Sequence, residues 1–193
     1  MKRLSDFLIS LALIIVLLPF MIIIGIIIKI DSPGPIFYCR KKNGRPAHRL
    51  GKKTKPFYYF KFRSMFVGTE KVTKFGFFIR RWHIDELPEL FLVLIGSMSL
   101  VGPRPLPRGR INRNLQSYYA SLESKPGITG PFQINQCNKN TVEEIIRMNN
   151  WYSKNQGFLT DLIIILKTPL VIIKRKGGGK GNFQNTIKVT QKR

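Results

Sequence analysis

FLISLALIIVLLPFMIIIGIII, residues 7–28, is a run of 22 residues without a charged side chain, and it lies between Asp6 and Lys29. As an α-helix it would be about 33 Å long, which is enough to cross the hydrocarbon core of a bilayer. The run is too long for the apolar part of a secretory signal peptide, and no small-x-small cleavage site follows it. The stretch therefore predicts a helix in the membrane, and a single spanning helix is the simplest form.

Two features of this stretch favour a helix that enters one leaflet, bends and returns. Pro19 lies near the middle of the run, where it removes a backbone hydrogen bond and kinks a helix. Basic residues flank both ends, with Lys2 and Arg3 before the run and Lys29, Arg40, Lys41, Lys42 and Arg45 after it. Because the positive-inside rule places basic flanks in the cytoplasm, both ends are expected on that side. We therefore predict a re-entrant anchor over residues 1–30, broken at Pro19.

The composition predicts an anionic partner. The 193 residues include 33 Lys and Arg against 10 Asp and Glu, a net charge of +23, while 44% hydrophobic residues exclude a disordered basic protein. Ten of the basic residues and no acid fall between Ser32 and Thr69, interleaved with aromatics beside the anchor. Anionic lipid headgroups, rather than nucleic acid, are the expected partner of this segment. Cys39 and Cys137 fit no disulfide or zinc spacing and indicate free thiols in a reducing compartment.

The rest of the chain predicts an α+β fold that is predominantly helical. After a Pro/Gly-rich corner at 30–36, residues 35–39 and 57–62 suit short strands. Helical periodicity predicts helices over 72–82, from the acidic pair at 85–86 to a stop at Gly96, over 112–122 and over 141–155. The apolar stretch 159–174 contains Asp161, Lys167 and Pro169, so it is expected in the membrane interface or on the core. We predict a compact interfacial catalytic domain over 31–174 and a flexible basic tail over 175–193.

The few acids make their clustering informative. Three of the ten fall within five residues, in the stretch DELPE that begins at Asp85. Carboxylates at a helix start stabilise the helix dipole, so capping is one interpretation. An adjacent pair repels itself unless a cation lies between its members, and Mg²⁺ is commonly held by one or two carboxylates plus substrate phosphates. The residues alone leave both interpretations of Asp85 and Glu86 open.

The second candidate group is Gly102-Pro103-Arg104-Pro105. The prolines Pro103 and Pro105 restrict the backbone around one arginine, which favours a bidentate grip on a phosphate, although a lone GPRP also suits a surface turn. Lys61 and Arg63 in KFRSM equally suit surface charge, and PGITG at 126–130 equally suits a turn. His48 and His83 are too isolated to indicate a zinc site.

Six blocks in order resemble one family. They are SPGPIFY at 32–38, YFKFRSM at 59–65, the stretch 80–86 with DELPEL, SMSLVGPRP at 97–105, KPGITG at 125–130, and the pair Gln133 and Asn135. Any one block is loose, but the ordered set is similar to the bacterial sugar transferases. These are small monotopic polyprenyl-phosphate phosphoglycosyl transferases that start glycoconjugate assembly. The resemblance runs from the anchor to about residue 170.

This resemblance implies a re-entrant, proline-broken helix in the bacterial inner membrane, with the active site facing the cytoplasm. It implies a ping-pong transfer in which Asp85 attacks the β-phosphorus of a UDP-sugar and expels UMP. A polyprenyl phosphate, such as undecaprenyl phosphate, then takes the phosphosugar from the aspartate. Glu86 resembles the partner that holds Mg²⁺, Arg80 and Arg104 resemble phosphate-binding arginines, and Lys61 matches a basic position near the site. Covalent phospho-intermediates on carboxylates fit this scheme.

Six positions depart from the usual pattern of the family. Its members commonly have a serine before the proline of the anchor, an asparagine and an acid after DELPELF, a small residue before the dyad, and an arginine and an aspartate further on. This chain has Leu18 in place of the serine, Leu92 in place of the asparagine and Ser97 in place of the acid. It has His83 in place of the small residue, Cys137 in place of the arginine and Asn149 in place of the aspartate. The dyad and GPRP are intact, so activity is expected and the departures concern the supporting residues.

Two alternatives remain open at this stage. The first is a non-enzymatic membrane-anchored basic protein that binds anionic lipid or nucleic acid, which explains the charge but not the clustered acids. The second is a hydrolase of nucleotide sugars, which would release UMP without a polyprenyl acceptor. No residue distinguishes an N-acetylated amino sugar from a neutral hexose.

Overall fold

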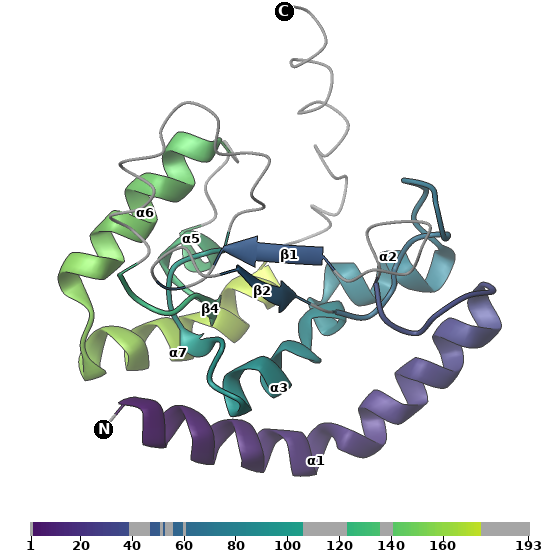
Figure 1. Ribbon diagram of the computed structural model, residues 1–193, viewed down its shortest axis with the longest axis horizontal. Helices are drawn as coiled ribbons and strands as arrows, with labels where there is room; N and C mark the ends of the chain where they lie inside the picture. Colours follow the sequence, from purple (N-terminus) through teal and green to yellow (C-terminus); the bar gives the residue numbers. More distant parts are fainter. Residues whose placement is uncertain are drawn as a thin grey trace, which may run out of the picture.

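The computed structural model describes residues 2–38, 47–50, 52, 56–59, 61–105, 123–135 and 141–174. Within these ranges the chain is predominantly helical with a few short strands, which confirms that part of the predicted fold class. The predicted helix over 112–122, Cys39, Cys137 and the basic tail lie outside the described residues. Figure 1 shows the long N-terminal helix along one edge of the molecule, with the other elements on one side of it.

Helix α1 (Lys2–Asp31) extends beyond the uncharged run at both ends. Within the described ranges it is the one helix that is long and apolar enough to cross a membrane. Its buried residues form one face against the domain: Asp6, Ser10, Ile14, Met21, Ile24, Gly25 and Ile28. The other face is exposed and almost wholly apolar, and it includes Ile15, Val16, Ile22, Ile23 and Ile26. An apolar surface of this extent indicates a contact with lipid.

The helix is continuous through Pro19, which is exposed. Figure 1 shows that α1 is bent rather than straight. Pro19 has no N–H to donate to the preceding turn, which is a sufficient physical cause for a bend. The predicted break is therefore a bend within one helix and not an interruption.

The two ends of α1 pack on different parts of the same domain. At the first turn, Lys2 Nζ donates to Val101 O at 3.1 Å and pairs with Asp161, while Arg3 donates to the carbonyls of Val93 and Leu94, each at 2.6 Å. At the last turn, the guanidinium of Arg63 donates to three carbonyls, those of Ile28 at 3.3 Å, Ser32 at 2.6 Å and Pro33 at 2.8 Å. Arg63 is therefore a buried cap of the C-terminal end of α1, and its interpretation as surface charge is wrong.

Helix α2 (Lys74–Arg81) begins where Thr73 Oγ1 accepts a hydrogen bond from Gly76 N at 2.9 Å, so the prediction over 72–82 is two residues too long at the start and one at the end. The acidic pair does not open the following helix as predicted. It lies in a separate 3₁₀ turn, η2 (Ile84–Glu86), and α3 (Glu89–Leu94) begins after Pro88. Because Pro88 lacks an N–H, the α-helical bond from residue 88 to Ile84 is impossible, and Leu87 N bonds to Ile84 O instead. Gly96, with φ of 86°, follows the end of α3.

Two small sheets complete the domain. Strands β1 (Ala47–Leu50) and β2 (Pro56–Tyr59) pair in antiparallel fashion, and an isolated antiparallel bridge joins Phe37 to Phe62. Strand β3 (Ser99–Val101) pairs in parallel with β4 (Gly127–Thr129), so the interpretation of PGITG as a turn is wrong. The backbones at Gly102 and Gly127 approach each other closely, because a Cβ at Gly127 would lie 2.0 Å from Gly102 N. Glycine on both strands is therefore what allows GPRP to pack against PGITG.

The C-terminal helices cover β3 and β4. Short helix α5 (Pro131–Ile134) leads to α6 (Val142–Asn155), where Thr141 Oγ1 caps Glu144 N at 3.3 Å, and to α7 (Phe158–Lys174). The helix predicted over 141–155 is thus confirmed, and the apolar stretch 159–174 forms a helix as well. Val101, Tyr152 and Ile164 form a buried cluster that joins β3, α6 and α7. Apart from Ile164, the apolar residues of α7 are mostly exposed, including Leu162, Ile163, Leu166 and Leu170. Figure 1 places α7 beside the N-terminal half of α1, and Lys2 of α1 bonds to Asp161 of α7.

Candidate active site

Asp85 lies at the centre of the 3₁₀ turn η2 and is 3% exposed. Its Oδ2 pairs with Lys61 Nζ at 2.8 Å. The backbone makes a second link between the same segments, since Phe62 N donates to Asp85 O at 2.9 Å. The extended segment of KFRSM is therefore fixed to the turn that carries the carboxylate, and it places one ammonium group on that carboxylate.

His83 precedes the acidic pair in the left-handed region, with φ of 54° and ψ of 20°. A residue with a Cβ is uncommon there, and such conformations are concentrated at functional sites. This backbone brings His83 Nδ1 to 3.5 Å from Glu86 Oε2. The departure at His83 from the usual small residue thus adds a direct contact to the second carboxylate of the pair.

Glu86 is ionised at neutral pH. Burial is the largest influence and by itself would raise the pKa of Glu86. The hydrogen-bonding contact with His83 and the positive charges of Arg104, His83 and Lys61 outweigh it and lower the pKa to about 2. Its side chain is 18% exposed, so solvent and ligands reach the carboxylate. The two neighbouring acids therefore differ, Asp85 being covered by Lys61 and Glu86 facing a pocket.

Arg104 approaches the acidic pair from the GPRP segment that follows β3. Asn149 of α6 holds its backbone, with Oδ1 accepting from Arg104 N at 2.8 Å and Nδ2 donating to Arg104 O at 3.1 Å. The guanidinium lies over the Phe132 ring, with Cζ 5.4 Å from the ring centroid. Pro103 O accepts from Gly127 N at 3.0 Å, so the segment is fixed on both sides of the arginine.

Two pockets meet at Glu86. A small polar one of about 10 Å³ is lined by Glu86, Glu89, Arg104, Pro105, Tyr59 and Gln133, with Gly127 and Ile128. A larger one of about 210 Å³ is lined mainly by apolar side chains from the η2 region, β4 and α7. Glu86, Ile128 and Gln133 line both. Glu86 is thus reached from a polar side and from an apolar side.

The structure brings most of the predicted site residues together. Lys61 contacts Asp85, Arg104 acts on Glu86, and Pro105 lines the polar pocket. Arg80 is separate from this group. Its Nε donates to Ser64 Oγ at 2.6 Å, and it lines neither pocket that contains Glu86. A phosphate-binding role for Arg80 therefore stays a prediction.

Three side chains at the site were not assigned a role from the sequence. Glu89, 2% exposed, is the third acid of DELPE and could have been found from that cluster. Gln133 belongs to the Gln-x-Asn block, but nothing in a short polar motif says which atoms it presents. Asn149 lies 45 positions from Arg104 in the chain, so no local pattern could have linked them.

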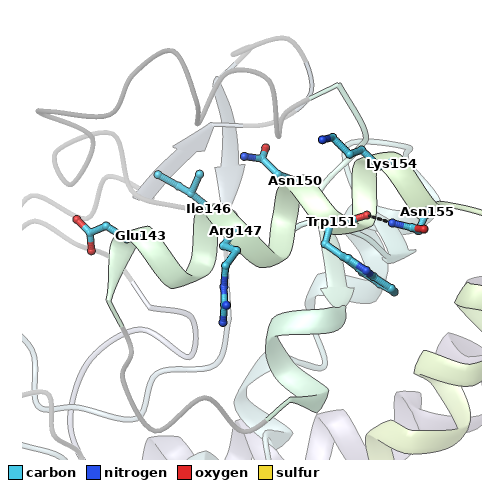
Figure 2. Close-up of a pocket in the computed structure, with 7 residues that line it drawn as sticks. All are labelled: Glu143, Ile146, Arg147, Asn150, Trp151, Lys154 and Asn155. Atoms are coloured by element: carbon cyan, nitrogen blue, oxygen red, sulfur yellow. Dashed lines mark hydrogen bonds between the residues drawn. The ribbon is translucent and has the colours of Figure 1, made fainter.

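A wider hollow, of about 520 Å³, lies on α6 away from the acidic pair (Figure 2). All of its lining residues come from α6, from Glu143 to Asn155, and the labelled side chains spread along one helix rather than converging. Asn155 Nδ2 bonds to Trp151 O at 2.8 Å, an ordinary contact within a helix. None of the predicted site residues lines this hollow.

The donor set beside Glu86 fits Mg²⁺. Carboxylate oxygens of Glu86 and Glu89 and the amide of Gln133 line the polar pocket, and Gln133 Oε1 makes no hydrogen bond to the described residues. Among those same residues no group of three or more His, Cys, Asp and Glu side chains could hold an ion alone. Mg²⁺ is usually bound by one or two carboxylates plus substrate phosphates. These residues therefore fit an ion whose coordination would be completed by phosphate oxygens of the substrate.

Comparison with known proteins gives one consistent result. The family model described as bacterial sugar transferase matches residues 1–175. The chain is 35% identical to the UDP-glucose:undecaprenyl-phosphate glucose-1-phosphate transferase of Xanthomonas campestris pv. campestris, over 91% of this chain and 39% of that protein. It is 31% identical to the undecaprenyl-phosphate galactose phosphotransferase of Salmonella typhimurium, over 92% of this chain and 41% of that protein.

A third relative is similar in length. It is an uncharacterised sugar transferase of Bacillus subtilis, 34% identical over 86% of this chain and 82% of that protein. The chain spans about two fifths of the length of the first curated relatives it matches. The family match covers the membrane helix, the acidic turn and GPRP together. The chain belongs to the bacterial sugar transferase family.

Proposed function

We propose that this protein transfers a phosphosugar from a UDP-sugar to a polyprenyl phosphate as the first membrane step of glycoconjugate assembly. The observation that carries the proposal is the buried ion pair of Asp85 and Lys61, placed directly beside the ionised Glu86 and Arg104. Two relatives whose names specify transfer to undecaprenyl phosphate match over nine tenths of this chain. Their names differ in the sugar, glucose in one and galactose in the other, so the sugar stays open.

The proposed reaction has two displacements at one phosphorus. An Oδ of Asp85 attacks the β-phosphorus of the UDP-sugar, the bond from that phosphorus to the bridging oxygen breaks, and UMP leaves with that oxygen. A phosphate oxygen of the polyprenyl phosphate then attacks the same phosphorus and breaks its bond to Asp85. The products are UMP and a polyprenyl diphosphate sugar, and the carboxylate is regenerated.

Lys61 has two proposed roles in this scheme. In the resting protein it neutralises Asp85, which is 3% exposed and lines neither pocket at Glu86. Attack on phosphorus requires Asp85 to be uncovered, so we infer that the ammonium moves from the carboxylate to a phosphate oxygen of the arriving substrate. The exchange keeps one positive charge near the reacting oxygens at each stage.

Arg104 and Glu86 are proposed to orient the diphosphate. The guanidinium offers parallel N–H donors that suit phosphate oxygens, and its backbone is already fixed by Asn149. Glu86, with Glu89 and Gln133 beside it, would hold Mg²⁺, which supplies charge neutralisation for the diphosphate when bound. Positioning and neutralisation of charge are the main contributions an enzyme makes to phosphoryl transfer.

We further propose that α1 is a re-entrant anchor of the cytoplasmic membrane. The proposal is supported by the contacts of both helix ends with one domain, Lys2 with Val101 and Arg63 with Ile28. A helix that crossed the bilayer would carry its two ends to opposite faces. Basic residues at both ends favour the cytoplasmic face for the domain and its site.

The test is a search for the covalent intermediate. Enzyme mixed with a UDP-sugar and no acceptor should release about one UMP per active site and gain the mass of the sugar phosphate on Asp85. Asp85→Asn should give neither, while Asp161→Asn, which changes a paired acid at the start of α7, should keep both. An adduct on a different residue would overturn the assignment. UMP release that continues over many turnovers without acceptor would instead identify a hydrolase.

A further inference from the structure

The larger pocket at Glu86 has apolar walls and a polar end. The walls come from three elements, with Trp82 and Leu87 on either side of η2, Ile128 and Thr129 on β4, and Thr168, Val171 and Ile172 on α7. The polar end is formed by Glu86, His83 and Gln133. The volume is about 210 Å³. This is below the roughly 300–1,000 Å³ of pockets that enclose a whole drug-sized ligand, so it suits a segment of a longer molecule.

We infer that this pocket is the acceptor subsite, and that it binds the isoprene units nearest the phosphate of the polyprenyl phosphate. The inference rests on the proposed function and adds the route by which the second substrate enters. Five of the seven wall residues are apolar, and the hydroxyls of Thr129 and Thr168 bond to each other at 2.7 Å, so the walls suit a hydrocarbon. The positive charges of Lys61 and Arg104, which act on Glu86 at this end of the pocket, would attract the anionic head of the same molecule.

The surroundings of the pocket indicate where the rest of the lipid chain lies. On α7, Val171 and Ile172 lie between Leu170 and Ile173, both of which are exposed. Trp82 is 40% exposed, and tryptophan is typical of the membrane interface. The α7 wall of the pocket is therefore flanked by exposed apolar side chains, which suits a helix lying in the interface. A long isoprenoid could therefore leave the pocket directly into the bilayer.

The division between the two pockets assigns one substrate to each side of Glu86. Arg104, which lines the small polar pocket, suits a phosphate oxygen of the UDP-sugar, and the larger pocket suits the acceptor. Both substrates then approach the acidic pair Asp85 and Glu86 from different directions. Such an arrangement predicts that a change in the apolar walls affects the second displacement and leaves the first intact.

Ile172→Trp is the test variant, because the larger side chain fills the pocket. Its matched control is Ile173→Trp, the same change one position along α7 on a side chain that is 67% exposed and does not line the pocket. For Ile172→Trp the KM for undecaprenyl phosphate should rise by about tenfold or more, while single-turnover UMP release without acceptor stays within roughly twofold of wild type. Ile173→Trp should change neither value. Thermal unfolding of both variants establishes that they fold equally.

A second measurement does not depend on turnover. A polyprenyl phosphate with a diazirine on its first isoprene unit should, on irradiation, label the peptide that contains Val171 and Ile172 in wild type. The label should persist in Ile173→Trp and be lost in Ile172→Trp. Labelling confined to another peptide, or equal KM values in the two variants, would overturn the acceptor subsite.

Other results separate this inference from the proposed function. A rise in the KM for the UDP-sugar in Ile172→Trp, with an unchanged KM for the acceptor, would assign the pocket to the nucleotide and refute the acceptor subsite alone. Absence of UMP release from wild type with every UDP-sugar would refute the proposed function itself. Normal turnover of wild type with no difference between the two variants would refute only the pocket assignment.

Discussion

The side-chain amide of Asn149 pairs with the backbone of Arg104 through two hydrogen bonds, one accepted at 2.8 Å and one donated at 3.1 Å. Asn149 is 0% exposed, so water does not replace either bond. A carboxylate at this position could accept from Arg104 N but would place a second oxygen against Arg104 O. The departure at Asn149 from the usual aspartate is therefore compatible with a fixed Arg104, and it supplies the donor that an ionised aspartate lacks.

The first prediction follows from this pairing. Asn149→Asp should lower the stability by about 1–3 kcal/mol, the usual cost of leaving a buried hydrogen-bonding group unsatisfied. It should also raise the KM for the UDP-sugar, because one of the two bonds that hold the backbone of Arg104 is lost. Both defects should lessen as the pH falls, since a protonated carboxyl can donate to Arg104 O. Thermal unfolding and initial rates over a pH series measure this.

A matched control exists on the same helix. Asn150→Asp makes the identical change at the next position, where the side chain lies on the hollow of α6 and not on Arg104. It should leave both stability and KM near the wild-type values. Equal stability and equal KM in the two variants would show that the pairing of Asn149 with Arg104 contributes to neither.

The second prediction concerns the ion pair of Lys61 and Asp85. Lys61→Met leaves a 3% exposed carboxylate without its ammonium, and breaking a buried pair in this way costs roughly 3 kcal/mol. Adding Asp85→Asn should recover much of that loss, so the double variant should be more stable than Lys61→Met. Free energies of unfolding from denaturant titration in detergent test the cycle. A Lys61→Met protein as stable as wild type would show that the pair is not a stabilising contact.

The third prediction uses the pH dependence that Glu86 imposes. Its folded-state pKa, about 2, lies below the ordinary value near 4.5, so the ionised form is favoured in the folded protein. The stabilisation is therefore complete above about pH 4.5 and is lost as the pH falls toward 2. Glu86→Gln should flatten this part of the stability profile. The free energy of unfolding of both proteins is measured from pH 5 to pH 2 in steps of about half a pH unit. Identical pH dependence in Glu86→Gln and wild type would contradict the proposed surroundings of Glu86.

What the sequence could predict depended on whether a feature is local. The uncharged run over residues 7–28, the helical period over 141–155 and the stop at Gly96 are local patterns, and the elements they predict are present. The break in DELPE was misread because the period of the apolar residues continued through Pro88. The spacing of apolar residues carries no information on backbone donors. The missing N–H of Pro88 separates η2 from α3.

The site was predicted by composition and order, but not by its contacts. Asp85, Glu86 and Arg104 were found because acids are rare and because the blocks occur in a known order. The pairing of β3 with β4 and of Asn149 with Arg104 joins residues far apart in the chain, and short strands such as Gly127–Thr129 carry too few residues to show a period. Arg63 was misread for the same reason, since the carbonyls that it caps lie about thirty positions earlier.

The fourth prediction tests that cap. Arg63→Met removes three hydrogen bonds to the C-terminal end of α1 and leaves its last carbonyls without a buried donor, so it should lower stability by roughly 3 kcal/mol or more. Lys71→Met removes a positive charge from an exposed position eight residues further along and should have little effect. Denaturant titration compares them. Equal unfolding midpoints would mean that Arg63 does not hold the anchor.

The last prediction concerns the topology of α1. With Cys39 and Cys137 replaced by serine, single cysteines at Ser5 and Pro35, both exposed, should react with a membrane-impermeant maleimide only after the inner membrane is permeabilised. Lys2 and Arg3 bind carbonyls of β3 and α3, while Arg63 binds carbonyls at the other end, so one domain holds both ends of the helix. A spanning helix would have to break one of these two sets of contacts and place either the amine of Lys2 or the guanidinium of Arg63 apart from its acceptors. Labelling of one cysteine in intact spheroplasts and not the other would establish that spanning form and exclude the re-entrant anchor.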